Sequence, residues 1–148
     1  MKSIYKTLTL SMMAMFLSAG LNAQKSNITK EDLPKSAQTF LKENFINERV
    51  VQAEKDNYGN RTDYEIVLSN GTEIEFDNKG NWKEVDAKNK EALPEGFIPR
   101  KIVQHITQNF APHQVSKIEK DRNKYEVELT NGIDLEFSLN GDFLRIDD

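Results

Sequence analysis

The chain contains one motif twice, and this repeat constrains the fold more than any other feature. The stretch YEIVLSNGTEIEF at residues 64–76 returns as YEVELTNGIDLEF at residues 125–137, a spacing of 61 residues. Upstream the spacing becomes 65, and it aligns Asn44-Phe45 with Asn109-Phe110. Two hairpins can converge on similar turns by chance, but chance would not also reproduce a preceding proline-led helix pattern. The repeat therefore indicates a tandem duplication.

The change in spacing predicts the position of a hairpin loop. DNYGNRTD at residues 56–63 is replaced by the shorter DRNK at residues 121–124 in the second copy. Length changes of this kind are tolerated at exposed turns, because a longer loop adds little closure entropy.

Each copy is predicted to begin with an amphipathic helix. Pro34 and Pro99 stand where proline is tolerated, in the first turn of a helix. Apolar residues then recur near helical spacing, which predicts one buried stripe per helix. These residues are Ala37, Phe40, Leu41 and Phe45 in the first copy, and Ile102, Ile106 and Phe110 in the second.

Four strands are predicted to follow each helix. In the first copy they cover residues 49–55, 62–69, 72–77 and 81–86, and the second copy repeats them from residue 114 to the C-terminus. The pairs Asn70-Gly71 and Asn131-Gly132 accept positive φ, which predicts two-residue type I′ hairpins. Four-residue turns ending on Gly80 and Gly141 come next. Such tight connections predict an antiparallel meander.

Alternation along the central strands divides the two faces of the sheet. The apolar set, expected to pack under the helices, is Tyr64, Ile66, Leu68, Ile74 and Phe76, with Tyr125, Val127, Leu129, Leu135 and Phe137. One unit of this size would be marginally stable alone. The predicted fold is therefore α+β: two tandem helix-plus-four-stranded units, residues 24–89 and 90–148, sharing one sheet with the helices on one face and the other face open.

Residues 1–23 have the features of a secretory signal. Lys2 and Lys6 precede an apolar run at residues 8–17, and Ala23 supplies a small residue for cleavage. The run is shorter than the roughly 20 residues that a membrane-spanning helix needs. We therefore predict a periplasmic protein that has no membrane attachment after cleavage.

Composition excludes several classes of function. The chain has no cysteine, which excludes a lipoprotein anchor, a disulfide framework and a thiolate metal site. Loss of Lys2 and Lys6 would change the formal charge from -4 to -6. An acidic protein is a poor partner for nucleic acid or an anionic membrane, because both bind positive patches.

The proline-led helix followed by YEIVLSNGTEIEFDNKGNWKEVD resembles the PepSY-like family, also described as resembling the beta-lactamase inhibitor protein. The second copy departs from the pattern with Phe143 in place of Trp82 and Ser138 in place of Asp77. The resemblance implies small exported proteins of Gram-negative bacteria, with helices on one side of a shared sheet. It also implies non-catalytic work, such as binding peptidases or other enzymes, without supplying a target.

The open face is the first candidate site because it is acidic. Lys83 and Arg145 cannot neutralise all of its carboxylates, so the face would suit a basic protein segment, a cationic peptide or Ca²⁺. The alternative is that these charges only keep an exposed sheet soluble. The carboxylates are Glu65, Glu73, Glu75, Glu126, Glu128, Asp134 and Glu136.

Trp82 and Phe143 are the second candidate site, since they follow equivalent turns. Alternation allows only one residue of each pair, Trp82/Val85 and Phe143/Ile146, to face the core unless a bulge intervenes. An exposed aromatic at the sheet rim would anchor a partner, whereas a buried one would belong to the core.

No residue pattern indicates catalysis, a cofactor or a metal site. His105 and His113 have no further ligand or acidic partner arranged around them, and the acidic residues do not match EF-hand spacing. We therefore predict an exported, non-enzymatic module that binds or inhibits a periplasmic protein or peptide through the open face. The alternative is a carrier of a small ligand or cation such as Ca²⁺.

Overall fold

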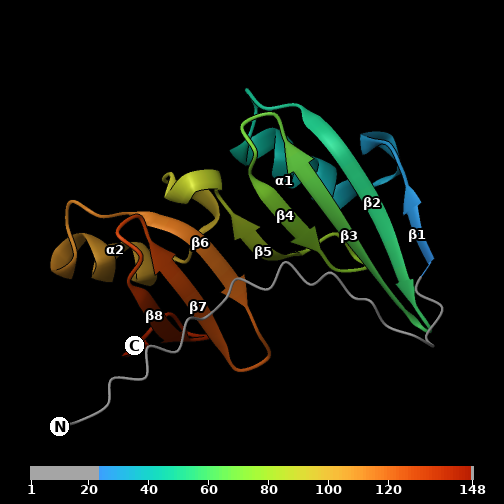
Figure 1. Cartoon of the computed structure of the whole chain (residues 1–148). Helices are drawn as coiled ribbons and strands as arrows, with labels where there is room; N and C mark the ends of the chain where they lie inside the picture. The colour runs from blue at the N-terminus through green and yellow to red at the C-terminus, as the bar shows by residue number, and fades with distance from the viewer. Residues whose placement is uncertain (1–23, 148) are drawn as a thin grey trace, which may run out of the picture.

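The computed structural model describes residues 24–147, which form an α+β fold with a nine-stranded antiparallel sheet (Figure 1). Each strand pairs with the next along the chain, so the sheet is one continuous meander. The predicted signal peptide and its cleavage position lie outside the described residues. The strands are β1 (Gln24–Asn27), β2 (Val50–Tyr58), β3 (Arg61–Leu68), β4 (Glu73–Phe76), β5 (Trp82–Asp86), β6 (Val115–Lys120), β7 (Lys124–Leu129), β8 (Asp134–Ser138) and β9 (Phe143–Asp147).

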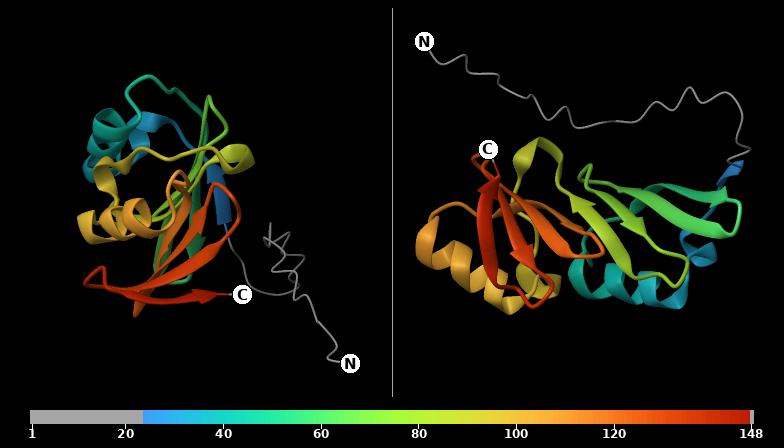
Figure 2. Two further views of the ribbon diagram at one scale, coloured as in Figure 1. Left: turned by 90° about the vertical axis from the view of Figure 1, so that its left-hand side faces the viewer. Right: turned by 90° about the horizontal axis from the view of Figure 1, so that it is seen from below.

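Two helices lie on the same side of this sheet (Figure 2). They are α1 (Lys35–Asn44) and α2 (Arg100–Asn109), and each begins directly after a proline, as the sequence predicts. Short 3₁₀ turns stand before α1, after β5 and before α2; they are η1 (Lys30–Asp32), η2 (Lys88–Lys90) and η3 (Glu95–Phe97).

The core lies between the helices and one face of the sheet. The ring of Phe40 on α1 meets Phe76 on β4 edge-on at 5.6 Å, and His105 on α2 meets Phe137 on β8 in the same way at 5.5 Å. Phe76 and Phe137 are fully buried. The apolar side chains that alternate along the strands therefore pack beneath the helices, while the acidic ones between them face away.

The β5–β6 pair joins the two halves into one sheet. Val85 on β5 stands opposite Ile118 on β6, and neither side chain is exposed to solvent. The apolar core consequently runs without a break from the first half into the second. The segment between β5 and α2 contributes to it, because Leu93 is buried and its amide donates a 2.8 Å hydrogen bond to the Val115 carbonyl.

The Asn-Gly hairpins differ from the predicted two-residue type I′ turns. Gly71 and Gly132 have positive φ, but the asparagines before them do not. The Gly71 amide donates to the Leu68 carbonyl at 2.8 Å, and the Leu68 amide donates to the Thr72 carbonyl at 2.9 Å. This is a three-residue loop in which the glycine forms a bulge, so one residue of positive φ suffices.

The four extra residues of the first copy lengthen two strands instead of a loop. β2 and β3 pair as far as Tyr58 and Arg61, with Gly59 in the turn. In the second copy the equivalent strands end at Lys120 and Lys124. The extension places Asp56 directly opposite Asp63.

Strand β1 was not predicted from the sequence. It is short and polar, and it pairs antiparallel with β2, so that Lys25 stands opposite Asp56. It occupies the same edge of β2 that β5 occupies on β6 in the second copy. The first copy therefore has its outer edge covered by the chain's own N-terminal segment.

Gly80→Ala should destabilise the fold, because Gly80 has a φ of +82° and lies against the start of α1. A Cβ there would stand 2.8 Å from the Ala37 amide nitrogen, in addition to the roughly 1–2 kcal/mol cost of left-handed backbone for an L-residue. We expect a loss above about 2 kcal/mol in the free energy of unfolding, measured by urea denaturation. Gly59→Ala is the control, since its φ is +57° but no atom lies within 4 Å of the added Cβ. Equal losses in both variants would contradict the packing argument.

Candidate functional site

A row of seven glutamates crosses the sheet on the face away from the helices, which we call the open face. Each member stands directly opposite the next in the strand register, from β2 to β8. We call this set the glutamate row: Glu54, Glu65, Glu75, Glu84, Glu119, Glu126 and Glu136. Like charges directly opposite on a sheet destabilise it, so the row needs a structural or functional reason.

A second acidic line runs beside the glutamate row, two residues along each strand. It includes Glu73, Asp86, Glu128, Asp134 and Asp147, and Lys117 on β6 is its basic member. The seven carboxylates predicted from the sequence are thus divided between these two lines. The prediction missed Glu54, Glu84 and Glu119, because alternation was applied only to the middle strands of each copy.

More basic side chains reach this face than the two considered in the sequence. Besides Lys83 and Arg145, five others form ion pairs with its carboxylates: Lys25, Arg61, Lys90, Lys117 and Lys124. Carboxylates remain in excess. Within the described residues Glu73, Glu119 and Asp134 have no basic nitrogen within ion-pairing distance.

At the β5–β6 junction one lysine, Lys117, forms ion pairs with two carboxylates. Lys117 Nζ lies 2.8 Å from Glu84 Oε1 and 3.6 Å from Asp86 Oδ2. Its neighbour Glu119, half-buried between Glu84 and Glu126, has no such partner, and burial together with these two carboxylates raises the pKa of Glu119. Burial also raises the pKa of Asp86, against the effect of Lys117. Negative potential is therefore concentrated at the centre of the open face.

At the C-terminal end of the glutamate row, two basic side chains neutralise Glu136. Arg145 Nε lies 2.7 Å from Glu136 Oε2, and Lys124 Nζ lies 2.5 Å from Glu136 Oε1. These hydrogen bonds lower the pKa of Glu136 to about 2. Glu136 is buried beneath its two partners and is therefore unavailable to a third.

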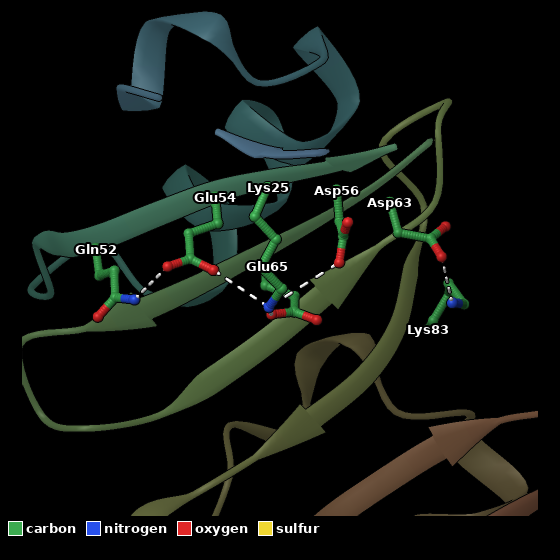
Figure 3. Close-up of polar contacts among 7 residues, drawn as sticks. All are labelled: Lys25, Gln52, Glu54, Asp56, Asp63, Glu65 and Lys83. Carbon is green, nitrogen blue, oxygen red and sulfur yellow. Dashed lines mark hydrogen bonds and ion pairs between the residues drawn. The ribbon is translucent and has the colours of Figure 1, made fainter. Parts of the chain in front are cut away.

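The β1 end of the row holds a lysine among three carboxylates (Figure 3). Lys25 Nζ lies 3.1 Å from Glu65 Oε2, 3.3 Å from Glu54 Oε2 and 4.0 Å from Asp56 Oδ2. Burial opposes the charge, but Glu65 and Glu54 outweigh it and raise the pKa of Lys25. An ammonium group from an extended segment is thus bound by carboxylates of the open face within the chain itself.

Asp56 is the least compensated of these carboxylates. Its residue exposure is 1 %, and within the described residues neither carboxylate oxygen has a hydrogen-bond donor. Asp63, opposite on β3, is better satisfied, because Arg61 Nε lies 2.9 Å and Lys83 Nζ 3.3 Å from its Oδ2. Its ion pair with Lys25 is long, at 4.0 Å, and burial of a carboxylate without a hydrogen-bond donor is costly, so Asp56 adds to the demand for positive charge here. The sequence prediction missed both aspartates: Asp56 was assigned to the loop between the predicted strands, and Asp63, near the start of the predicted strand 62–69, was not counted among the open-face carboxylates.

Trp82 and Phe143 lie on the helix side of the sheet. A register shift between β4 and β5 sets Trp82 opposite Phe76, so that Trp82 and Val85 both face the core. The same shift between β8 and β9 lets Phe143 stack on His105 at 4.4 Å. The bulge that the alternation argument required is therefore present in both copies, and neither aromatic belongs to the open face.

Residues 24–147 contain no group of three or more His, Cys, Asp or Glu side chains arranged to hold a metal ion. In the same part of the chain no helix is long and apolar enough to cross a membrane. Two shallow grooves beside α1, lined partly by Phe45 and Ile46, lie away from the glutamate row. Neither groove is lined by a member of the glutamate row.

Comparison with protein families gives one match, described as "putative beta-lactamase-inhibitor-like, PepSY-like", over residues 19–71 and 62–145. The chain belongs to the PepSY-like family. The two matched segments overlap at residues 62–71: the first includes α1 and ends after β3, and the second runs from β3 into β9 and includes α2. None of the curated proteins compared with the chain matches it.

Solved structures of similar proteins support this membership. A "putative calcium-regulated periplasmic protein" from Bacteroides thetaiotaomicron is 36% identical, with a TM-score of 0.78 over 84% of this chain and 97% of that one. A "putative periplasmic protein" of the DUF2874 family from Bacteroides vulgatus is 32% identical, with a TM-score of 0.78 over 84% of this chain and 98% of that one. A second B. vulgatus structure, a "putative periplasmic protein of unknown function", is 32% identical. Its TM-score is 0.78 over 84% of this chain and 100% of that one.

Glu119→Gln should stabilise this PepSY-like protein at neutral pH. The folded pKa of Glu119 is raised, so its ionised form opposes folding above that pKa, and the variant removes this cost. Relief of cross-strand repulsion is worth about 0.5 kcal/mol, or about 2 °C in Tm. The advantage should shrink as the pH falls through the folded pKa and vanish below the unfolded value of 4.5. Thermal melts across pH test this, and a lower Tm at pH 7 would contradict it.

Glu136→Gln should lower the stability of the fold at neutral pH, the opposite of the effect expected for Glu119→Gln. The folded pKa of Glu136 lies near 2, below the unfolded 4.5, so its charge stabilises the fold above pH 4.5 and this contribution disappears as the pH falls towards 2. The variant should melt below the wild type at pH 7 and converge with it near pH 2. Parallel melting curves with no convergence would show that Glu136 acts through packing alone.

Proposed function

We propose that the protein is an exported, non-enzymatic module that binds a basic segment of a protein or peptide through its open face. The observation that carries this proposal is the glutamate row, seven carboxylates in direct cross-strand register. A protein that needed only a soluble sheet would scatter charges of both signs, because opposed like charges cost stability. A basic partner would offset that cost on binding.

The proposal includes a tandem duplication of one structural unit. Residues 61 apart occupy equivalent strands, as in the Val85 and Ile146 pair or the Glu75 and Glu136 pair. We take the sheet as two copies of one unit, whose fusion aligns their acidic lines end to end. The result is a surface long enough to follow an extended chain across several strands, which one copy could not provide.

The Lys25 site indicates the kind of group that such a partner presents. In the folded chain an extended segment places one ammonium group among Glu54, Asp56 and Glu65. A lysine or arginine of a partner would meet similar surroundings at the centre of the face, where Glu119 lies between Glu84 and Glu126 and has no ion-pair partner of its own within residues 24–147. Charge pairs of this kind favour fast, salt-sensitive association.

Two findings on related proteins support the location and class of the proposed activity. The family is described as beta-lactamase-inhibitor-like, which agrees with a protein-binding role, including inhibition of an enzyme. The similar solved structures are described as periplasmic, which agrees with export by the predicted signal peptide. Neither finding names a partner for this chain.

Binding of a short polylysine peptide, measured by calorimetry at low and high salt, tests the proposal. The triple variant Glu84→Gln, Glu119→Gln and Glu126→Gln should weaken binding about tenfold, since each exposed charge pair contributes roughly 0.2–1 kcal/mol. Binding by the wild type should also weaken steeply with salt.

The control variant is Glu31→Gln, Glu43→Gln and Glu95→Gln, which removes the same charge from exposed positions away from the row. It should retain nearly wild-type affinity. If both triple variants weaken binding equally, only net charge matters, and the open face is not the site. Absence of peptide binding by the wild type would reject the proposal.

Ca²⁺ binding is the second candidate function, favoured by the description of the B. thetaiotaomicron structure as calcium-regulated. Ca²⁺ requires six to eight oxygen ligands, and the open face would have to rearrange to bring its carboxylates together. Thermal melting separates the two candidates, because a ligand of the folded state raises Tm. A rise with millimolar Ca²⁺ but not with polylysine would favour the ion.

A further inference from the structure

The C-terminal hairpin, β8 with β9, exposes an unusual share of the apolar surface. Of the large apolar side chains that are exposed in the described residues, four lie on this hairpin: Leu139, Phe143, Leu144 and Ile146. All five residues of β9 are exposed, and within residues 24–147 no strand pairs with its outer edge. Such an edge is a template for pairing with another strand.

The other edge of the sheet is protected. β1 presents four polar residues, with Lys25 among them, and charged or polar side chains are a common device against edge pairing. The two ends of the sheet therefore differ in character, and only β9 combines an open edge with apolar side chains.

The first half of the protein shows what covers the equivalent of β9. Val85 on β5 corresponds to Ile146 on β9, and β6 buries Val85 completely through Ile118, whereas Ile146 is 46 % exposed. Next to this apolar pair, Asp86 lies opposite Lys117, with the charged atoms 3.6 Å apart. A strand that suits β9 would thus place an apolar residue opposite Ile146 and a basic residue opposite Asp147.

We propose that this strand is the β9 of a second copy, paired antiparallel about a two-fold axis at Ile146. In that register Ile146 stands opposite its own equivalent, and Arg145 of each copy stands opposite Asp147 of the other. β9 is therefore self-complementary, with an apolar pair at the centre flanked by two ion pairs, as an isologous dimer requires. Pairing of β9 with a neighbour's β1 would be heterologous and would propagate into a filament.

The pairing has a consequence for the open face. A two-fold axis perpendicular to the sheet keeps both open faces on the same side, so the dimer would present two glutamate rows on one surface. A partner with two basic segments would then bind both copies with raised effective concentration. The dimer itself rests on β9 alone and does not depend on the proposed function.

Cross-linking through a single thiol tests the register, because the chain contains no cysteine. Ile146→Cys should form a disulfide dimer quickly under mild oxidation, since directly opposed residues across antiparallel strands have Cα atoms about 4.5–5.5 Å apart. Val51→Cys, at an exposed apolar position on β2, is the matched control and should cross-link at least tenfold more slowly. Equal rates would overturn the proposal.

Sedimentation equilibrium of residues 24–148 tests association without any cross-link. One strand pair makes a small interface, so the concentrations should run from about 1 µM to about 1 mM. Asp147→Lys, which sets a lysine opposite the second copy's Arg145, should raise the dissociation constant at least tenfold, and Glu43→Lys on α1 should not. A chain that stays monomeric throughout, or a dimer that is unaffected by Asp147→Lys, would overturn the β9 pairing.

Discussion

The pairing of β5 with β6 is the interaction on which the rest of the structure depends. It sets Val85 against Ile118 in a region without solvent exposure and so merges two marginal cores into one. The same pairing aligns the acidic line of one half with that of the other, because the register of a sheet fixes both faces at once. Glu84 and Glu119 stand opposite each other as a direct result. Core continuity and surface repulsion are thus two consequences of one strand register.

Much of this arrangement follows from the sequence. Prolines mark the starts of α1 and α2, and glycines of positive φ mark the hairpins. Period-two alternation assigns Glu65 and Glu126 to the face opposite Ile66 and Val127. These features are local, since each depends on backbone preferences within a few residues, and local preferences repeat faithfully in both copies.

The features that the sequence did not reveal depend on contacts between distant segments. β1 has no strand pattern of its own, and it is extended because β2 offers an unpaired edge and Asp56 attracts Lys25. The stretch around Asp56 has a loop-like composition, yet it continues the β2–β3 ladder. The bulges before Val85 and Ile146 turn Trp82 and Phe143 to the helix side of the sheet. Strict alternation of side chains along a strand cannot predict such bulges.

The two halves of the sheet differ in charge at the two ends of the glutamate row. In the first copy a strand extension and β1 surround Lys25 with carboxylates, whereas the second copy replaces Asp63 with Lys124 and Glu84 with Arg145. At one end of the glutamate row three carboxylates therefore share Lys25, whereas at the other end Glu136 has two basic partners. A basic ligand on such a surface experiences a potential that changes along its length, which would favour one direction of binding. If the two halves arose by duplication, as we propose, unequal charge substitution would make the open face directional while the apolar pattern of the core is kept in both halves.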